Sequence, residues 1–156
     1  MSIILPKTIT ERIKREAERQ GVSIEEYVVE LLSRDLNPED RAREYVKVSL
    51  ELLVQAKEEL ARDNIRQAAE KTWGAVALAI KAYAYWRDKR RLKNHRDLWE
   101  YKDKVVSELG EWVGKVFREA GGLHVCFYEG WCTRRDVEAV IPEAEKLVKE
   151  IAKSFR

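Results

Sequence analysis

The sequence has only two cysteines, two histidines and no long hydrophobic run, and each shortage narrows what the chain can be. Two cysteines are too few for the disulfide framework of a small secreted domain. Cys126 and Cys132 are six residues apart, which is wider than the usual spacing of a zinc-binding pair. We therefore expect a structural role for both cysteines, and their spacing leaves open whether they are bonded to each other.

The longest uncharged apolar stretch, residues 72–80, is far shorter than the ~20 residues that span a bilayer. Charged residues also follow soon after the N-terminal apolar residues, which is unlike a signal peptide. We therefore expect a soluble, cytoplasmic protein with no membrane partner. Scarce Asn, Gln and Met beside abundant Lys, Arg and Glu are typical of thermophilic proteins.

The charge is nearly balanced, with 30 basic and 28 acidic residues and a net charge of +2. This balance argues against a protein that is basic over its whole surface, as many nucleic-acid-binding domains are. The glycines match neither the P-loop nor the dinucleotide-binding glycine pattern. His124, Cys126 and Cys132 are close in sequence, but a zinc site needs a fourth ligand that the sequence does not clearly supply. We expect no metal and no cofactor.

Hydrophobic residues recur at steps of three and four over most of the chain, which predicts an all-α fold. Capping patterns predict helix starts at Thr8, Ser23, Asn37 and Thr133. The most apolar helix is expected over residues 65–87, antiparallel to a helix that begins at residue 38, at the centre of a helical bundle. Residues 110–130 hold five of the seven glycines, so this stretch is expected to be the least regular. Pro142 is expected to kink the last helix or to start it afresh.

Residues 1–37 are expected to form an N-terminal arm and a helical pair, and residues 38–156 the bundle. The strand-like arm Ile3-Ile4-Leu5-Pro6 with its two helices resembles a ribbon-helix-helix unit, in which strands from two chains enter the DNA major groove. However, residues 2–5 include no Arg, Lys, Asn or Gln to contact base edges or phosphates. We therefore favour an arm used for packing or dimerisation, with a DNA-binding regulator as the weaker alternative.

Residues 87–96 carry six basic residues and one acidic residue, and they are the best candidate for an anion-binding surface. Basic side chains bind phosphate oxygens, and aromatic rings stack on single-stranded bases. We predict that RNA or a nucleotide contacts this segment through Arg90, Arg91, Lys93, His95 and Arg96. The alternative is a solvated loop, with Asn94 or His95 capping the following helix.

Four segments carry a resemblance to known proteins. They are RQAAEKTWGA at residues 66–75, AIKAY at 79–83, NHRDLW at 94–99 and GLHVCFYEGW at 122–131. Together with Leu5-Pro6, they resemble the archaeal PaREP family and, more distantly, the HEPN superfamily (higher eukaryote and prokaryote nucleotide-binding domains). The resemblance covers nearly the whole chain and implies a HEPN-like antiparallel helical bundle and a homodimer.

The resemblance also implies a nuclease site, because HEPN ribonucleases carry an Arg followed, after four to six residues, by a His. Arg118 and His124 meet that spacing, although Glu119 stands where the superfamily usually has Asn, Asp or His. An imidazole exchanges protons near neutral pH, and a guanidinium stabilises charge on a phosphate. On a straight helix the two side chains lie about 120° apart, so their convergence requires a break at Gly121-Gly122 or a second chain. The alternative is a buried core His124 and a solvated Arg118.

We therefore predict a HEPN-like homodimer that binds nucleic acid or nucleotides. Metal-independent endoribonuclease activity would come from Arg118 and His124, with Tyr128 lining the site. The rival prediction is a non-catalytic interaction protein, such as the partner of a nucleotidyltransferase in a two-gene system.

Overall fold

The computed structural model describes residues 2–155, and within them the chain forms seven α-helices and no β-strand. The helices are α1 (Lys7–Gln20), α2 (Ile24–Leu32), α3 (Pro38–Ala61), α4 (Ile65–Asp88), α5 (His95–Leu109), α6 (Glu111–Glu129) and α7 (Arg134–Lys153). The predicted all-α helical bundle is confirmed, whereas residues 2–5 do not have the strand-like character that was predicted for the arm. The two predicted domains, residues 1–37 and 38–156, begin and end with Met1 and Arg156. These two residues lie outside the described residues.

Side-chain hydrogen bonds fix where four of the helices begin. Ser23 Oγ accepts from Glu26 N at 3.1 Å and Glu26 Oε2 accepts from Ser23 N at 2.7 Å, which is the predicted capping box. Asn37, Asn94 and Thr133 cap α3, α5 and α7, each accepting from the backbone N–H three residues later. The prediction at Thr8 is wrong, because α1 begins at Lys7 after Pro6 and has no side-chain cap. The fixed φ of Pro6 sets the entry into this helix instead.

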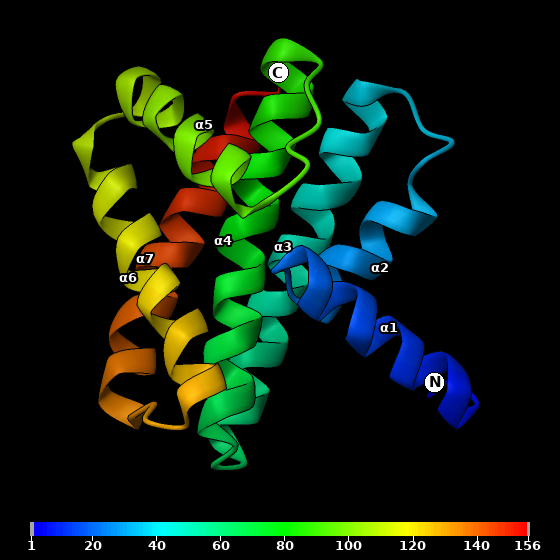
Figure 1. The fold of residues 1–156 in the computed structure, drawn as a ribbon. Coiled ribbons are helices and arrows are strands. Elements are labelled where there is room, and N and C mark those ends of the chain that lie inside the picture. Colours follow the sequence, from blue (N-terminus) through cyan, green and yellow to red (C-terminus); the bar gives the residue numbers. More distant parts are fainter. Residues whose placement is uncertain (1, 156) are drawn as a thin grey trace.

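The helices α3 and α4 form an antiparallel pair joined by the turn at residues 62–64, and α4 lies at the centre of the bundle (Figure 1). α4 contacts α2, α3, α5, α6 and α7. Its alanines are fully buried, and their small side chains let these neighbours approach from several sides. Two charged side chains of this helix, Glu70 and Lys81, are buried with them.

The helix α6 runs without interruption from Glu111 to Glu129, through Gly121 and Gly122. The expected irregularity of residues 110–130 is therefore wrong for most of the stretch. Gly121 lets α5 and α6 pack closely, because a Cβ there would make a tight contact of 3.3 Å with Trp99 Cζ2 of α5. α7 likewise continues through Pro142 as one helix. An uninterrupted α6 fixes the directions in which its side chains leave the helix.

The helices α1 and α2 diverge from the turn at Gly21, and α1 projects away from the bundle (Figure 1). Gly21 adopts a left-handed φ of 69°, as predicted for the end of the first helix. α2 packs against α4, which attaches the N-terminal pair to the bundle. No helix within residues 2–155 combines the length and the hydrophobicity needed to cross a membrane.

Candidate functional site

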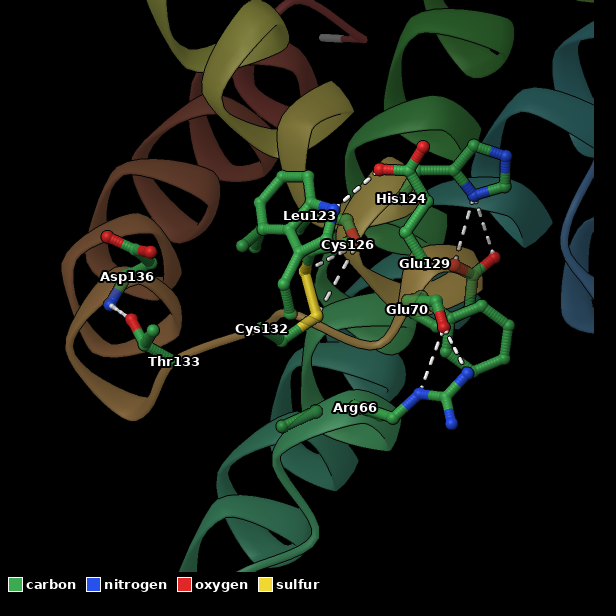
Figure 2. Close-up of a disulfide and its surroundings, with 12 residues drawn as sticks. Arg66, Glu70, Leu123, His124, Cys126, Glu129, Cys132, Thr133 and Asp136 are labelled. Carbon is green, nitrogen blue, oxygen red and sulfur yellow. Dashed lines mark hydrogen bonds and ion pairs between the residues drawn. A yellow bond between two sulfur atoms is a disulfide. The ribbon is translucent and has the colours of Figure 1, made fainter.

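The His124 ring lies against the carboxylate of Glu70, which comes from a neighbouring helix. His124 is on α6 and Glu70 on α4, and His124 Nδ1 is 3.1 and 3.0 Å from the two carboxylate oxygens. Figure 2 shows the ring with one nitrogen toward Glu70 and the other away from it. The two side chains are 13% and 8% exposed, so water and salt screen the pair only weakly. A carboxylate in this position orients an imidazole and fixes its tautomer.

Burial raises the pKa of Glu70, because the ionised carboxylate is poorly solvated inside the bundle. The hydrogen bond with His124 opposes this shift by stabilising the ionised form. When Nδ1 of His124 donates to Glu70, Nε2 carries the free lone pair. The pair can therefore take up a proton at Nε2 while the carboxylate stabilises the imidazolium that results.

Three other rings pack against the His124 imidazole. Its centroid is 5.4 Å from that of Trp73, 5.1 Å from that of Tyr128 and 6.1 Å from that of His95. The Tyr128 ring stands perpendicular to the imidazole and is half exposed, so it forms the outer wall of the cluster. Two of the predicted site residues, His124 and Tyr128, are thus in contact.

His95 begins α5 and stacks on His124 at an interplanar angle of 28°. Its Nε2 accepts a hydrogen bond of 2.7 Å from Trp99 Nε1. Burial lowers the pKa of His95, and the neighbouring His124 lowers it further. Asn94, and not His95, caps α5. His95 is therefore held as a neutral hydrogen-bond acceptor behind the Glu70–His124 pair.

A second buried charge pair joins α2 to α4. Lys81 Nζ is 2.9 Å from Glu26 Oε1, and the two side chains are almost fully buried. The other Glu26 oxygen accepts from the backbone N–H of Ser23, whereas Oε1 has the ion pair with Lys81 but no hydrogen bond. The net stability gained from a buried ion pair is small, because desolvation offsets the attraction. The pair serves mainly to fix α2 against the helix that carries Glu70.

A pocket of about 240 Å³ opens beside this cluster, between α1, α4 and the end of α6. Its polar lining includes Lys14 and Glu18 of α1, Glu25 of α2, Glu70 of α4 and Tyr128 of α6, so carboxylates outnumber the one lysine. His124 is not part of the lining, and it is connected to the pocket through its contacts with Glu70 and Tyr128. A space of this size fits one ring of a ligand better than a whole drug-sized molecule.

Arg118 does not meet His124 within one chain. Because α6 is continuous, the two side chains leave it about 120° apart. Arg118 is exposed and folds back along α6, where a Cβ added at Gly114 would lie 3.1 Å from its Nη1. The break considered at Gly121-Gly122 is absent, so only a second chain can bring an Arg118 to His124.

The basic segment 87–96 is largely exposed, but much of its charge is paired within the chain. The ion pairs are Arg87–Glu108, Lys89–Glu39, Arg90–Asp97, Arg91–Glu30 and Arg96–Glu100. Lys93 is exposed, and its backbone N–H donates to Asp97. A concave surface holds Lys89, Arg90, Arg91, Lys93 and Lys104 with the acidic Asp88, Asp97 and Glu100. Positive charges outnumber negative ones there, by a smaller margin than the sequence alone indicates.

The match to a family model covers the part of the chain that carries the central pair of this site. Residues 44–148, well over half of the chain, match the model of the archaeal PaREP1/PaREP8 family. The chain belongs to this family. No curated protein matches the chain, and neither does any solved structure.

The PaREP1/PaREP8 match begins within α3 and ends within α7. It includes the Glu70–His124 pair and His95, whereas Lys14 and Glu26 come from α1 and α2, before the matched residues. The family model therefore includes the central pair but not the N-terminal helices that complete the pocket.

A disulfide closes the end of α6 next to the site (Figure 2). Cys126, two residues from His124, is bonded to Cys132 just before α7. Arg66 of α4 holds the same end by donating hydrogen bonds of 3.0 and 2.5 Å to Phe127 O. The bonded sulfurs do not serve as metal ligands, and among residues 2–155 no group of three His, Cys, Asp or Glu side chains is placed to hold a metal ion.

Sequence patterns missed the roles of Glu70 and Lys81, and they identified Glu26 only as part of the Ser23 capping box. A signal was present, because all three are charged residues on helix faces that are otherwise buried. An unpaired charge is costly in such a place, so each should have a partner. Those partners lie far away in sequence, and helical periodicity alone does not identify them.

Proposed function

We propose that this PaREP1/PaREP8 protein is a HEPN-like homodimer that binds RNA or a nucleotide and cleaves RNA without a metal ion. The observation that supports this most is the Glu70–His124 pair beside a pocket. A buried carboxylate that orients an imidazole is an arrangement used for proton transfer. His124 is the proposed catalytic residue, and Glu70 is its positioning residue.

In the proposed reaction, His124 Nε2 removes the proton of a ribose 2′-hydroxyl. The 2′-oxygen attacks the adjacent phosphorus, and the bond between phosphorus and the 5′-oxygen breaks. The leaving 5′-oxygen takes a proton from water, and the hydroxide that remains takes the proton from His124 Nε2, which restores the neutral imidazole. One product ends in a 2′,3′-cyclic phosphate and the other begins with a 5′-hydroxyl. Glu70 lies 3.0 Å from Nδ1 and favours the imidazolium formed in the first step.

The reaction also needs positive charge near the phosphate, and there are two candidate sources. Lys14 lines the pocket together with Glu70 and Tyr128. Arg118 is exposed on α6, so the Arg118 of a second copy is the other source. The resemblance to HEPN ribonucleases favours Arg118, whereas the pocket within one chain favours Lys14.

We propose that the RNA approaches along the basic segment 87–96. This segment leads directly into His95, whose ring stacks on His124. The proposed contacts are Arg90, Arg91, Lys93 and Arg96. Since most of these side chains also pair with carboxylates of the same chain, we expect weak binding with a shallow salt dependence.

Incubation with single-stranded RNA in excess EDTA tests this function. The proposal predicts cleavage that resists the chelator and leaves 2′,3′-cyclic phosphate ends. Lys14→Ala and Arg118→Ala identify the cation that acts, and Lys115→Ala is the matched control because Lys115 is exposed on α6 outside the pocket. RNA that stays intact would reject the nuclease, and cleavage that EDTA abolishes would reject the metal-independent reaction.

A second proposal is a non-catalytic interaction protein, such as the partner of a nucleotidyltransferase in a two-gene system. Exposed aliphatic side chains favour it, namely Ile3, Ile4, Leu5, Leu31, Leu32, Leu50 and Val54. Exposed apolar patches mark binding surfaces. Native affinity purification is then expected to recover a nucleotidyltransferase while RNA stays intact. Recovery of the protein without that partner would count against this alternative.

A further inference from the structure

Residues 2–5 form an apolar arm that lies in solvent in the isolated chain. Ile3 is 75% exposed, Ile4 95% and Leu5 43%. The arm has no regular secondary structure and precedes Pro6, after which α1 begins. Three consecutive exposed aliphatic side chains are unfavourable in water and favourable once covered. The arm is thus built to bind an apolar surface.

An apolar groove lies between α2 and α3 of the same chain. α2 packs against α4, and Arg41 of α3 donates hydrogen bonds to Glu30 O and Ser33 Oγ at the end of α2. A groove of about 380 Å³ is left between α2 and α3. Its aliphatic lining comes from Ile24, Val28, Leu32, Leu36, Val48 and Leu52. Leu32 is 77% exposed, so the groove is uncovered in the isolated chain. Its chemistry matches that of the arm.

The arm does not reach this groove on its own chain. The 14 residues of α1 separate the arm from α2 by about 21 Å of helix. Residues 2–6 span at most about 17 Å when fully extended. Figure 1 shows α1 and α2 diverging from their turn, so the arm starts at the end of α1 that lies away from the groove. The arm can therefore be covered by such a groove only if the groove belongs to a second molecule.

The charges around the arm and the groove are complementary. Glu44 and Glu51 are among the groove-lining residues. Lys7 follows the arm after Pro6 and pairs with Glu11, and Arg12 and Arg15 are exposed on α1. An arm seated in the groove would bring these basic residues toward the acidic rim. Because arm and groove are on the same chain, one two-fold axis can satisfy both copies at once.

We propose that two copies of this chain exchange arms, with residues 2–5 of each copy bound in the α2–α3 groove of the other. The exchange rests on the proposed homodimer and is independent of the nuclease reaction. The arm and α2 lie before the residues matched by the family model, whereas the α3 side of the groove lies within them.

Disulfide cross-linking between two tagged variants tests the exchange. One variant carries Ile4→Cys and the other Leu32→Cys, and they are mixed under mild oxidation. The exchange predicts a mixed dimer of the two variants, with little cross-linking of either variant alone. Strong self-linking of Ile4→Cys without the mixed product would show that arms pair with each other, and it would overturn the proposal.

Deletion of residues 2–5 tests the same contact through the dimer dissociation constant, measured by light scattering over a concentration series. We expect the constant to rise about tenfold for each aliphatic side chain removed from the groove. Val54→Ser is the matched control, because Val54 is exposed on α3 but outside the groove. An unchanged constant would overturn the exchange while leaving the homodimer, and a monomeric wild-type chain would overturn both. RNA cleavage is scored separately on the same samples, so failure of the nuclease is distinguishable.

Discussion

Glu70 lies in α4, where most side chains are buried and an ionised carboxylate is poorly solvated. Burial raises its pKa, and the hydrogen bond with His124 restores part of the stability of the ionised form. The chain therefore keeps a destabilising group at the centre of its bundle. Retention of such a group is typical of a functional site.

We expect Glu70→Gln to stabilise the fold increasingly as the pH rises. A carboxyl group whose pKa is raised by folding stabilises the fold while it is protonated. This contribution is lost as the pH rises from the ordinary pKa of 4.5 through the raised pKa of the folded protein. Gln is uncharged and still accepts a hydrogen bond from His124. Urea unfolding at pH 5 and pH 8 measures the difference. A variant less stable than wild type by the same amount at both pH values would contradict this.

We expect the wild-type protein to lose stability in acid through His95. Its pKa is lowered by burial, so the stability that neutral His95 contributes is present above the ordinary value of 6.5 and lost as the pH falls through the lowered value. Protonated Nε2 no longer accepts from Trp99, and the charge faces His124 and Lys81, with Glu26 opposing them. Melting temperatures between pH 7.5 and 5 should fall less for His95→Gln. An equal fall in both proteins would contradict this.

At the scale of residues, sequence singled out His124 and Tyr128, which the structure places in contact. The sequence could place these two residues in one site because they are one helical turn apart. Glu70 is 54 positions before His124, so no local pattern connects them. The pairing depends on how α4 and α6 pack, which the sequence of either helix does not specify.

At the scale of helices, capping residues located the starts of α2, α3 and α7 because each cap acts within four residues. The same local reasoning was wrong for α6, where glycines indicated an irregular segment. Glycine lowers helix stability by about 1 kcal/mol, but tertiary packing can outweigh that preference. Gly121 allows Trp99 to pack closely, and this contact is between helices rather than along one.

The two neighbouring glycines of α6 give a paired prediction. Gly122→Ala should raise the free energy of unfolding by about 0.5–1 kcal/mol, because a Cβ there meets nothing within 4 Å. Gly121→Ala should gain less or lose stability, since its Cβ would lie 3.3 Å from Trp99. Chemical denaturation of both variants measures this. A larger gain for Gly121→Ala would show that the α5–α6 packing is looser than described.

Reduction of the Cys126–Cys132 disulfide should lower the free energy of unfolding by about 2 kcal/mol, as expected for a short closed loop. We expect the lost stability to come mainly from the end of α6 that carries Tyr128. Thermal unfolding with and without a reductant measures it, and the double variant Cys126→Ala, Cys132→Ala is the control that should not respond. Equal melting temperatures for the oxidised and reduced wild type would contradict this.

At the scale of the whole molecule, periodicity predicted an all-α bundle with residues 65–87 at its centre, and α4 occupies that position. The apolar composition of residues 65–87 already indicates a helix that is buried on nearly every side. The arrangement of α1 and α2 was not predictable, because α2 is fixed by the ion pair of Glu26 with Lys81, which is distant in sequence. The position of α1 forms one side of the pocket, and the position of α2 leaves the groove between α2 and α3.

The central claim is that His124, oriented by Glu70, transfers a proton during RNA cleavage. The most direct measurement is the single-turnover cleavage rate of wild type and His124→Ala in excess EDTA, with circular dichroism confirming that both are folded. The account predicts that wild type cleaves and that His124→Ala is slower by about 10²–10⁴-fold. Equal rates for the two folded proteins would contradict it.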